Sequence, residues 1–344
     1  FSHLQLLLEV IKANPQITSY LLPGDRDWAS SGKIGWECVK ALEDYIEDQD
    51  IDNLRWTLDQ GCPGPDVEEL SSSTLLVTLN TQWWNHPHRK PTPADAVCDY
   101  SEPSIVMEEI HDAVEENLDK NIIIAGHFPL ASQGRYGGEF PIIDHFSPPI
   151  LGSFKIAYQQ NIGGSKNLNN QYYEPFRDQL KDIAIKNQGI FFLGGHEPNQ
   201  QLIDYRGNYI INSGAPSKGR WVSKHKPAIF TSTLPGFTVL TFAANGQVSY
   251  QFYEVLEDGI TVSKSLMLFD QACTPIPDAG IATNPNYQPC FTEVDSQALI
   301  KPELPATVVV EGGTSYGAGK TKRLFLGDHY RTTWLQPVEV PVLD

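Results

Sequence analysis

The sequence predicts an α/β protein, a layered α/β sandwich in which helices cover a sheet. Up to about residue 200, short apolar runs of strand length alternate with segments whose apolar residues have helical spacing. A run of hairpin-like strands follows these segments. This order of elements is typical of layered α/β proteins.

The elements of the first half follow from local patterns. Leu4, Leu7, Leu8 and Ile11 have helical spacing, so "FSHLQLLLEVIKANPQI" is expected to be a helix. Because Phe1 already belongs to this helix, the N-terminal part of the domain is expected to lie upstream. The segments that follow are a strand, a helix, an irregular segment and a buried strand: "ITSYLLP", "WECVKALEDYIEDQD", "LRWTLDQGCPGPDVEEL" and "STLLVTLNTQWW".

The second half continues the alternation and then changes to strands. Helices are predicted at "SIVMEEIHDAVEENLD" and "YYEPFRDQLKDIAIKN", and strands that run into loops at "KNIIIAGHFPLAS" and "GIFFLGGHEPNQQ". Antiparallel strands are predicted at "RGNYIINSGAPSKG", "GFTVLTFAANGQVSYQFYEV" and "ITVSKSLML", with Ala-Asn-Gly as a hairpin turn. Residues 1–270 are therefore expected to form one domain.

Residues 271–344 are rich in proline and glycine, and we predict an extended connector that leads toward a possible further domain. Within it, "TSYGAGKT" (Thr314–Thr321) is similar to a phosphate-binding loop. Thr314 stands where the first glycine of that motif belongs, and too few residues follow for a nucleotide-binding domain. A flexible glycine-rich linker is the better interpretation.

The composition argues against two kinds of partner. The chain has 344 residues, is 40% hydrophobic and has a formal net charge of -17. This charge disfavours nucleic acid, whose phosphates attract Lys and Arg, and it is explained by solubility. No apolar run reaches the ~20 residues of a transmembrane helix, so we expect no membrane span in this chain.

The five cysteines indicate an extracytoplasmic protein. None forms a C-x-x-C motif, so a zinc ribbon or a thioredoxin motif is not indicated. Cys62 and Cys98 lie in loop-like sequence, and Cys273 and Cys290 bracket a proline-rich stretch, so we predict one disulfide within each pair. Disulfides persist outside the cytoplasm. The alternative is five buried, reduced thiols, and the pairing state of Cys38 stays open.

Polar residues follow the predicted strands at Asp25, Asn80, His127 and His196. Loops at the carboxyl ends of strands can converge on one site in an open α/β sheet. Alone, each histidine would more often be a hydrogen-bonded structural residue. Together with Asp25 they supply one carboxylate and two imidazoles, a donor set that suits zinc, iron or manganese. We expect either no cofactor or one such divalent metal at Asp25, His127 and His196.

The order of these motifs resembles the calcineurin-like metallophosphoesterases, in particular their purple-acid-phosphatase-like branch. "PGDRDW" is similar to the family's Gly-Asn-His-Asp loop, "AGHFPLAS" to Ala-Gly-His-Tyr-Pro, and "GGHEPNQQL" to Gly-His-x-His-Asn-Leu-Gln. "GCPGP", "LVTLNTQWWNHPHRKP" and "GRYGGEF" look like a Bacteroidetes-type envelope subfamily, which is often fused to an outer-membrane surface-antigen barrel. The resemblance covers residues 1 to about 258 and, more loosely, 305–344. It implies the metallophosphoesterase type of sandwich.

Several positions depart from the family, whose two metals activate water and clamp a phosphate. Asp25 stands at a metal-binding Asn and could still ligate, while Arg26 stands at the catalytic His. An arginine cannot act as a general acid, although it could hold a phosphate. Pro198 replaces a histidine ligand and has no donor atom, and Asn80 stands where the subfamily has Asp. The family's first metal-binding motifs lie before the point that corresponds to Phe1.

These departures give two main functional hypotheses. The first is a catalytically impaired, pseudoenzyme module that binds or scaffolds other envelope or outer-membrane proteins, in the periplasm or at the cell surface. The alternative is an active phosphoesterase, for phosphomonoesters or phosphodiesters, with a reduced one-metal site. Whether the chain is an enzyme is therefore an open question that leans toward no. Carbohydrate or lipid recognition is a further possibility, and it would require Trp83 and Trp84 to be exposed.

Overall fold

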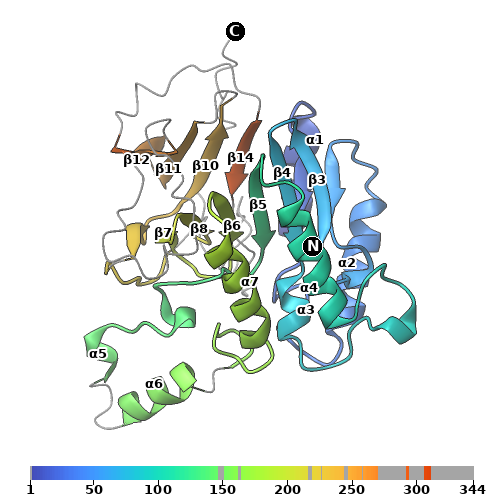
Figure 1. Ribbon diagram of the computed structural model, residues 1–344, viewed down its shortest axis with the longest axis horizontal. Coiled ribbons are helices and arrows are strands. Elements are labelled where there is room, and N and C mark those ends of the chain that lie inside the picture. Colours follow the sequence, from blue (N-terminus) through green and yellow to red (C-terminus); the bar gives the residue numbers. More distant parts are fainter. Residues whose placement is uncertain are drawn as a thin grey trace.

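Helices, a large mixed sheet and a smaller antiparallel sheet form the body of the protein (Figure 1). The computed structural model describes residues 2–145, 151–161, 164–215, 219–225, 227–243, 247–257, 259–269, 292–293 and 306–310. The predicted α/β class, with helices and a mixed sheet, is confirmed. The turn residues 244–246, residues Cys273 and Cys290, and the loop 314–321 lie outside the described residues.

The large sheet has seven strands in the order β3-β4-β5-β6-β8-β7-β9. Neighbours from β4 to β8 pair in parallel, whereas β3 and β7 run antiparallel to their neighbours. The central strands are buried on both faces, which explains their nearly continuous apolar runs. In sheet order, the strands are β3 (Asp66–Ser71), β4 (Thr74–Leu79), β5 (Asn121–Gly126), β6 (Ile190–Gly194), β8 (Asn208–Ser213), β7 (Gln200–Tyr205) and β9 (Ala228–Ser232).

The two faces of this sheet belong to different hydrophobic cores. In β5, Ile122 and Ile124 pack in the core on the helical side, whereas Ile123 and Ala125 pack in the core shared with the second sheet. This alternation is the period of two that a pleated strand imposes on its side chains. The sheet is therefore the middle layer of the protein.

The helical layer covers the first face mainly through α4 and α7 (Figure 1). Val106, Ile110 and Val114 of α4 are fully buried in the helix-side core, at the spacing of one helical face. A separate apolar cluster joins α1 to α2 and to the short strand β2 (Leu54–Trp56). The helices are α1 (Ser2–Ala13), α2 (Gly35–Glu47), α3 (Thr81–Asn85), α4 (Pro103–Glu115), α5 (Ile142–His145), α6 (Leu151–Asn161) and α7 (Glu174–Lys186), and the 3-10 turns are η1 (Asp59–Gly61), η2 (Pro93–Asp95) and η3 (Arg135–Gly137).

The second sheet has five antiparallel strands in the order β13-β12-β11-β10-β14. Tyr250, Phe252 and Leu266 are fully buried in the core between the sheets. Strands β13 and β14 lie within the range 271–344 and pair with β12 and β10. The strands are β10 (Gly236–Phe242), β11 (Val248–Leu256), β12 (Gly259–Phe269), β13 (Thr292–Glu293) and β14 (Ala306–Val310).

Two local predictions are wrong. The segment expected to be irregular contains β2 (Leu54–Trp56), which pairs in parallel with β1 (Ser19–Leu21), and also contains β3. The strand expected to extend through "NTQWW" ends at Leu79, because Asn80 caps the short helix α3 by accepting a hydrogen bond from the Trp83 amide. Neither feature has a local periodicity that would reveal it.

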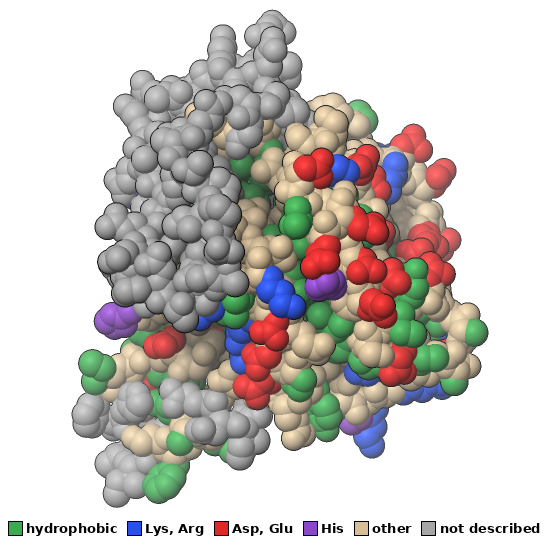
Figure 2. Space-filling model, in the orientation of Figure 1, with side chains coloured by type: hydrophobic (Ala, Val, Ile, Leu, Met, Phe, Trp, Pro, Cys, Tyr) green, Lys and Arg blue, Asp and Glu red, His purple; other side chains and the backbone are tan. Residues whose placement is uncertain are grey.

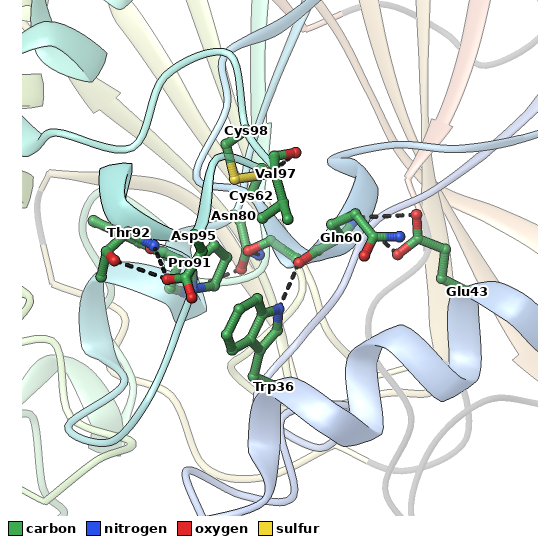
Figure 3. Close-up of a disulfide and its surroundings, with 12 residues drawn as sticks. Trp36, Glu43, Gln60, Cys62, Asn80, Pro91, Thr92, Asp95, Val97 and Cys98 are labelled. Atoms are coloured by element: carbon green, nitrogen blue, oxygen red, sulfur yellow. Dashed lines mark hydrogen bonds between the residues drawn. A yellow bond between two sulfur atoms is a disulfide. The ribbon is translucent and has the colours of Figure 1, made fainter.

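The disulfide between Cys62 and Cys98 is confirmed, with the two Cα atoms 5.7 Å apart (Figure 3). It ties the "GCPGP" loop to the segment that follows η2. The same loop is held from the other side, because the Gln60 amide donates to the Glu43 carboxylate and the Trp36 indole donates to the Gln60 carbonyl (Figure 3). Cys38 is a free thiol.

The surface agrees with the acidic composition. In Figure 2, acidic side chains gather over the side of the protein that Figure 1 shows to contain α2, α4 and β3. Such a surface repels phosphate groups. Among the described residues, no helix is both long enough and apolar enough to cross a membrane.

Candidate functional site

The structure brings Asp25, His127 and His196 together. Asp25 lies in the loop after β1. His127 directly follows β5, and His196 is the second residue after the neighbouring parallel strand β6. The backbone amides of Gly195 and His196 both donate to the His127 carbonyl at 3.0 Å, so the two loops are fixed side by side. The expectation that these strand ends converge is therefore correct.

Gly24 permits the first loop to approach the second. A Cβ atom at this position would lie 2.7 Å from Nδ1 of His127, which is shorter than any real contact. The loop is also folded on itself, since the Gly24 amide donates to the Asp27 carboxylate at 2.8 Å. A glycine is thus required here by space.

The three side chains form a chain of hydrogen bonds. Nε2 of His127 lies 3.1 Å from Oδ1 of Asp25 and 3.0 Å from Nδ1 of His196. Nε2 of His196 lies 2.8 Å from the carbonyl oxygen of Lys166. All three residues are buried, with at most 9% of their surface exposed.

These partners determine which nitrogens hold protons. A carbonyl oxygen only accepts, so Nε2 of His196 is the donor and its Nδ1 presents a lone pair when the ring is neutral. The Asp25 carboxylate likewise only accepts, so Nε2 of His127 holds a proton and lies between two acceptors. This one N–H of His127 therefore faces both acceptors, while Oδ2 of Asp25 accepts no hydrogen bond from the described residues.

Lys166 contacts two members of the cluster. Its Nζ lies 3.2 Å from Oδ2 of Asp25, and 30% of its side chain is exposed. The sequence analysis missed this residue, because nothing in "GGSKNLNN" indicates a contact with a loop 141 positions away. Lys166 thus contacts Asp25 through its side chain and His196 through its backbone.

The site shifts two pKa values. Burial alone would raise the pKa of Asp25, but the hydrogen bond and charge of His127, with His196 and Lys166, hold it well below its usual range. Burial, followed by the neighbouring His127, lowers the pKa of His196 to about 3. At neutral pH the cluster therefore contains an ionised carboxylate and a neutral His196.

The donor set fits a single metal ion. The ligand atoms of Asp25, His127 and His196 all lie within 4.8 Å of one another. In a tetrahedral site with nitrogen and oxygen ligands, ligand atoms are separated by ~3.3 Å, which is close to the observed hydrogen-bond distances. When bound, such an ion would supply Lewis-acid chemistry. These residues would hold it only after giving up their mutual hydrogen bonds.

A second metal lacks ligands in the part of the chain that the structure describes. Pro198 offers no side-chain donor, and its carbonyl accepts from the Arg220 amide at 2.5 Å. No other group of three His, Cys, Asp or Glu side chains converges among the described residues. Pro198 therefore cannot contribute a side-chain ligand at this site.

Arg26 and Asn80 do not join the cluster. The Arg26 side chain is half-buried and makes no hydrogen bond or ion pair with the described residues. Asn80 is fully buried and holds the backbone, accepting from the Trp83 amide and donating to the Gly61 carbonyl at 3.0 Å. Arg26 thus remains available to an anion, whereas Asn80 has a structural role.

Trp83 and Trp84 are core residues rather than an exposed aromatic surface. Only 3% and 7% of their surfaces are exposed. Trp84 stacks on Phe176 of α7 with ring centroids 4.2 Å apart, and the Trp83 indole donates to the Pro91 carbonyl. Their burial removes the feature on which carbohydrate or lipid recognition was based.

Glu197, the residue that follows His196, holds the neighbouring loop and was also missed by sequence reasoning. Its Oε1 accepts hydrogen bonds from the Ser132 hydroxyl at 2.9 Å and from the amides of Tyr136 and Gly137 at 2.7 and 3.0 Å. Burial raises its pKa to about 7, although these hydrogen bonds oppose the shift. Glu197 therefore connects the loop after β6 to the loop after β5.

We expect Glu197→Ala to lower the free energy of unfolding by about 2 kcal/mol, because two backbone amides lose their acceptor. Glu197→Gln, which keeps an acceptor oxygen, should lower it by clearly less. Urea denaturation of the two variants and the wild type checks this. Equal losses in both variants would mean that the hydrogen bonds of Glu197 do not stabilise the loop.

Comparisons with known proteins add a weak structural similarity. No protein-family model matches the chain, and no curated protein does. A solved structure described as "GAP50 the anchor in the inner membrane complex of Plasmodium" matches with a TM-score of 0.28 and 18% sequence identity. The match covers 59% of this chain and 48% of that one, so the chain spans about half the length of that protein. At this score, the match identifies neither a fold family nor a function.

Proposed function

We propose that this chain is a catalytically impaired module of the metallophosphoesterase type, which binds or scaffolds other proteins of a bacterial envelope or outer-membrane assembly. The three-layer arrangement, with Asp25, His127 and His196 on strand-end loops, supports that fold type. It is the arrangement that the resemblance in "PGDRDW", "AGHFPLAS" and "GGHEPNQQL" implies.

The main support is that the candidate centre is closed by its own side chains. Asp25 is hydrogen-bonded to His127 and forms an ion pair with Lys166. His196 is hydrogen-bonded to His127 and to the backbone carbonyl of Lys166. A phosphoesterase needs an activated water and a group that protonates the leaving group. Arg26 cannot supply that proton, and Pro198 cannot complete a two-metal site.

The extracytoplasmic location is supported by the Cys62–Cys98 disulfide. Disulfides are rare in the reducing cytosol and common in the periplasm and at cell surfaces.

The test measures hydrolysis of a phosphomonoester, p-nitrophenyl phosphate, and of a phosphodiester, bis(p-nitrophenyl) phosphate. Zn²⁺, Fe²⁺ or Mn²⁺ is added to each assay. We expect turnover by the wild type to be no higher than turnover by His127→Ala. His111→Ala, which removes a half-buried histidine that pairs with Glu115 on α4, is the matched control. Turnover that is lost in His127→Ala and kept in His111→Ala would overturn the proposal.

The scaffold role is tested in the native envelope. His127→Ala should leave the amount and size of the assembly that contains this chain unchanged on native electrophoresis. Deletion of the chain should change that assembly. If the assembly forms unaltered without the chain, it has no scaffold role there.

The convergence of Asp25, His127 and His196 favours a second candidate, a phosphoesterase with one metal. Asp25, His127 and His196 would hold the ion, and Arg26 would bind the substrate phosphate. Elemental mass spectrometry of the natively purified protein separates the two candidates. One tightly bound metal per chain, with metal-dependent turnover, would support this reading, whereas a metal-free and inactive protein supports the first.

A further inference from the structure

Lys166 is the residue that joins the two ends of the Asp25–His127–His196 cluster. Its ammonium lies 3.2 Å from Oδ2 of Asp25, and its carbonyl accepts from Nε2 of His196 at 2.8 Å. The other oxygen of Asp25 is already bonded to His127. Oδ2 accepts no hydrogen bond from the described residues, and its partner is a cation, because it forms an ion pair with the Lys166 ammonium.

A buried carboxylate needs such a partner. Asp25 is 5% exposed, and an isolated charge at this depth would be strongly unfavourable. Since His196 is neutral in the arrangement that its hydrogen bonds require, Lys166 contributes a formal positive charge next to the carboxylate. It balances Asp25 in the protein without metal.

A divalent ion at the same donors would meet this ammonium. Metal binding through Asp25, His127 and His196 uses the carboxylate that Lys166 neutralises and brings two further positive charges within a few ångströms of Nζ. Like charges in a partly buried site repel strongly. Either the ammonium leaves or the metal binds weakly.

The surroundings of Lys166 let its side chain leave while its backbone stays. The side chain is 30% exposed, so the ammonium can turn into solvent. The backbone of the segment is held by other hydrogen bonds. The side-chain amide of Asn85 donates to the Ser165 carbonyl at 2.7 Å, and the backbone amide of Leu168 donates to the Tyr136 carbonyl at 2.8 Å. Removal of the ammonium should therefore leave the loop in place.

We propose that Lys166 is an internal counter-ion that competes with a divalent metal for Asp25, so that the metal-free cluster is the resting form of this protein. This inference goes beyond the proposed scaffold function, because it concerns occupancy of the cluster and not catalysis. The donor atoms and Lys166 support it without any assumption about activity.

The experiment is a calorimetric titration of the full chain with Zn²⁺, repeated with Co²⁺ while the visible absorption of the bound ion is recorded. Lys166→Met and Lys166→Gln should bind Zn²⁺ about tenfold more tightly than the wild type, or better, because a like charge is removed. Lys166→Arg keeps the charge and should show no gain. Lys181→Met is the matched control, since it removes an ammonium that pairs with an aspartate away from the cluster.

A gain restricted to the two neutral variants at position 166, and lost when His196→Ala is added, supports the proposal. Equal Zn²⁺ affinity in the wild type and Lys166→Met, an equal gain in Lys166→Arg, or no binding by any of them would overturn it. Lys166→Gln keeps a hydrogen-bond donor toward Asp25 and serves if the methionine variant does not fold.

A measurement on the wild type provides an independent check. Acetylation of Lys166 by an amine-reactive acetyl donor, quantified by peptide mass spectrometry, should increase as Zn²⁺ is added, because the metal displaces Nζ from Asp25. Lys181 should show no such increase. Labelling of Lys166 that is unchanged by Zn²⁺ would overturn the proposal.

Discussion

Acidification from pH 7 to pH 4 should lower the free energy of unfolding of the metal-free protein by about 3 kcal/mol through His196 alone. An unfolded histidine titrates near ~6.5, whereas burial lowers the pKa of His196 in the folded protein to about 3. Between these values the unfolded chain binds a proton that the folded chain does not. Stability is therefore highest above the unfolded pKa and is lost as the pH falls.

Several titrating groups surround His196, so the measurement must isolate it. His127, Asp25 and Lys166 contact the ring or its partners. Glu197 acts in the opposite direction, since its raised pKa makes the folded state gain stability as the pH falls through about 7. The whole-protein pH profile is a sum of these effects.

The useful quantity is the stability difference between the wild type and His196→Gln, measured by urea denaturation in the presence of a chelator. Glutamine can still donate to the Lys166 carbonyl and does not titrate. The difference should fall by about 3 kcal/mol from pH 7 to pH 4. A difference that does not change between pH 7 and pH 4 would show that His196 binds its proton equally well in the folded and the unfolded protein.

Replacing both Cys62 and Cys98 by serine should lower the free energy of unfolding by about 4 kcal/mol. The disulfide joins residues 36 positions apart, and breaking it frees the unfolded chain to explore more conformations. The folded state is affected less, because Glu43 and Trp36 continue to hold the Gln60 backbone (Figure 3).

Cys38→Ser is the matched control, since Cys38 is a free and half-buried thiol. It should leave the urea midpoint close to that of the wild type, whereas the double variant should unfold at a clearly lower concentration. Peptide mapping after alkylation should also recover Cys62 and Cys98 as one linked pair. Recovery of both as alkylated thiols would contradict the disulfide and the extracytoplasmic location that it supports.

The central strands could be predicted because their signal is local. "STLLVTL", "NIIIAG" and "IFFLG" are apolar on both faces, and a strand between two layers requires that composition. Strand β2 (Leu54–Trp56) and the edge strand β3 (Asp66–Ser71) gave no comparable signal. β2 has only three residues, and β3 exposes most of its acidic sequence. These two strands form because they pair with β1 and β4, respectively, and their own sequence pattern does not predict them.

The candidate site divides in the same way. Asp25, His127 and His196 were found from the sequence because a polar residue after an apolar strand is visible in a short window. Their distances, and the proton positions that follow from them, required the parallel pairing of β5 and β6 and the close approach at Gly24.

The sequence by itself determined the α/β class, the burial of the central strands, the cysteine pair 62 and 98, and the residue types at the strand ends. Only the tertiary structure decided that Lys166 contacts the cluster, that Glu197 connects the loops after β5 and β6, and that Trp83 and Trp84 are buried. The physical reason is that burial and strand propensity are encoded by neighbours in the chain. An ion pair between residues 25 and 166 depends on how the layers pack, and no local pattern records it.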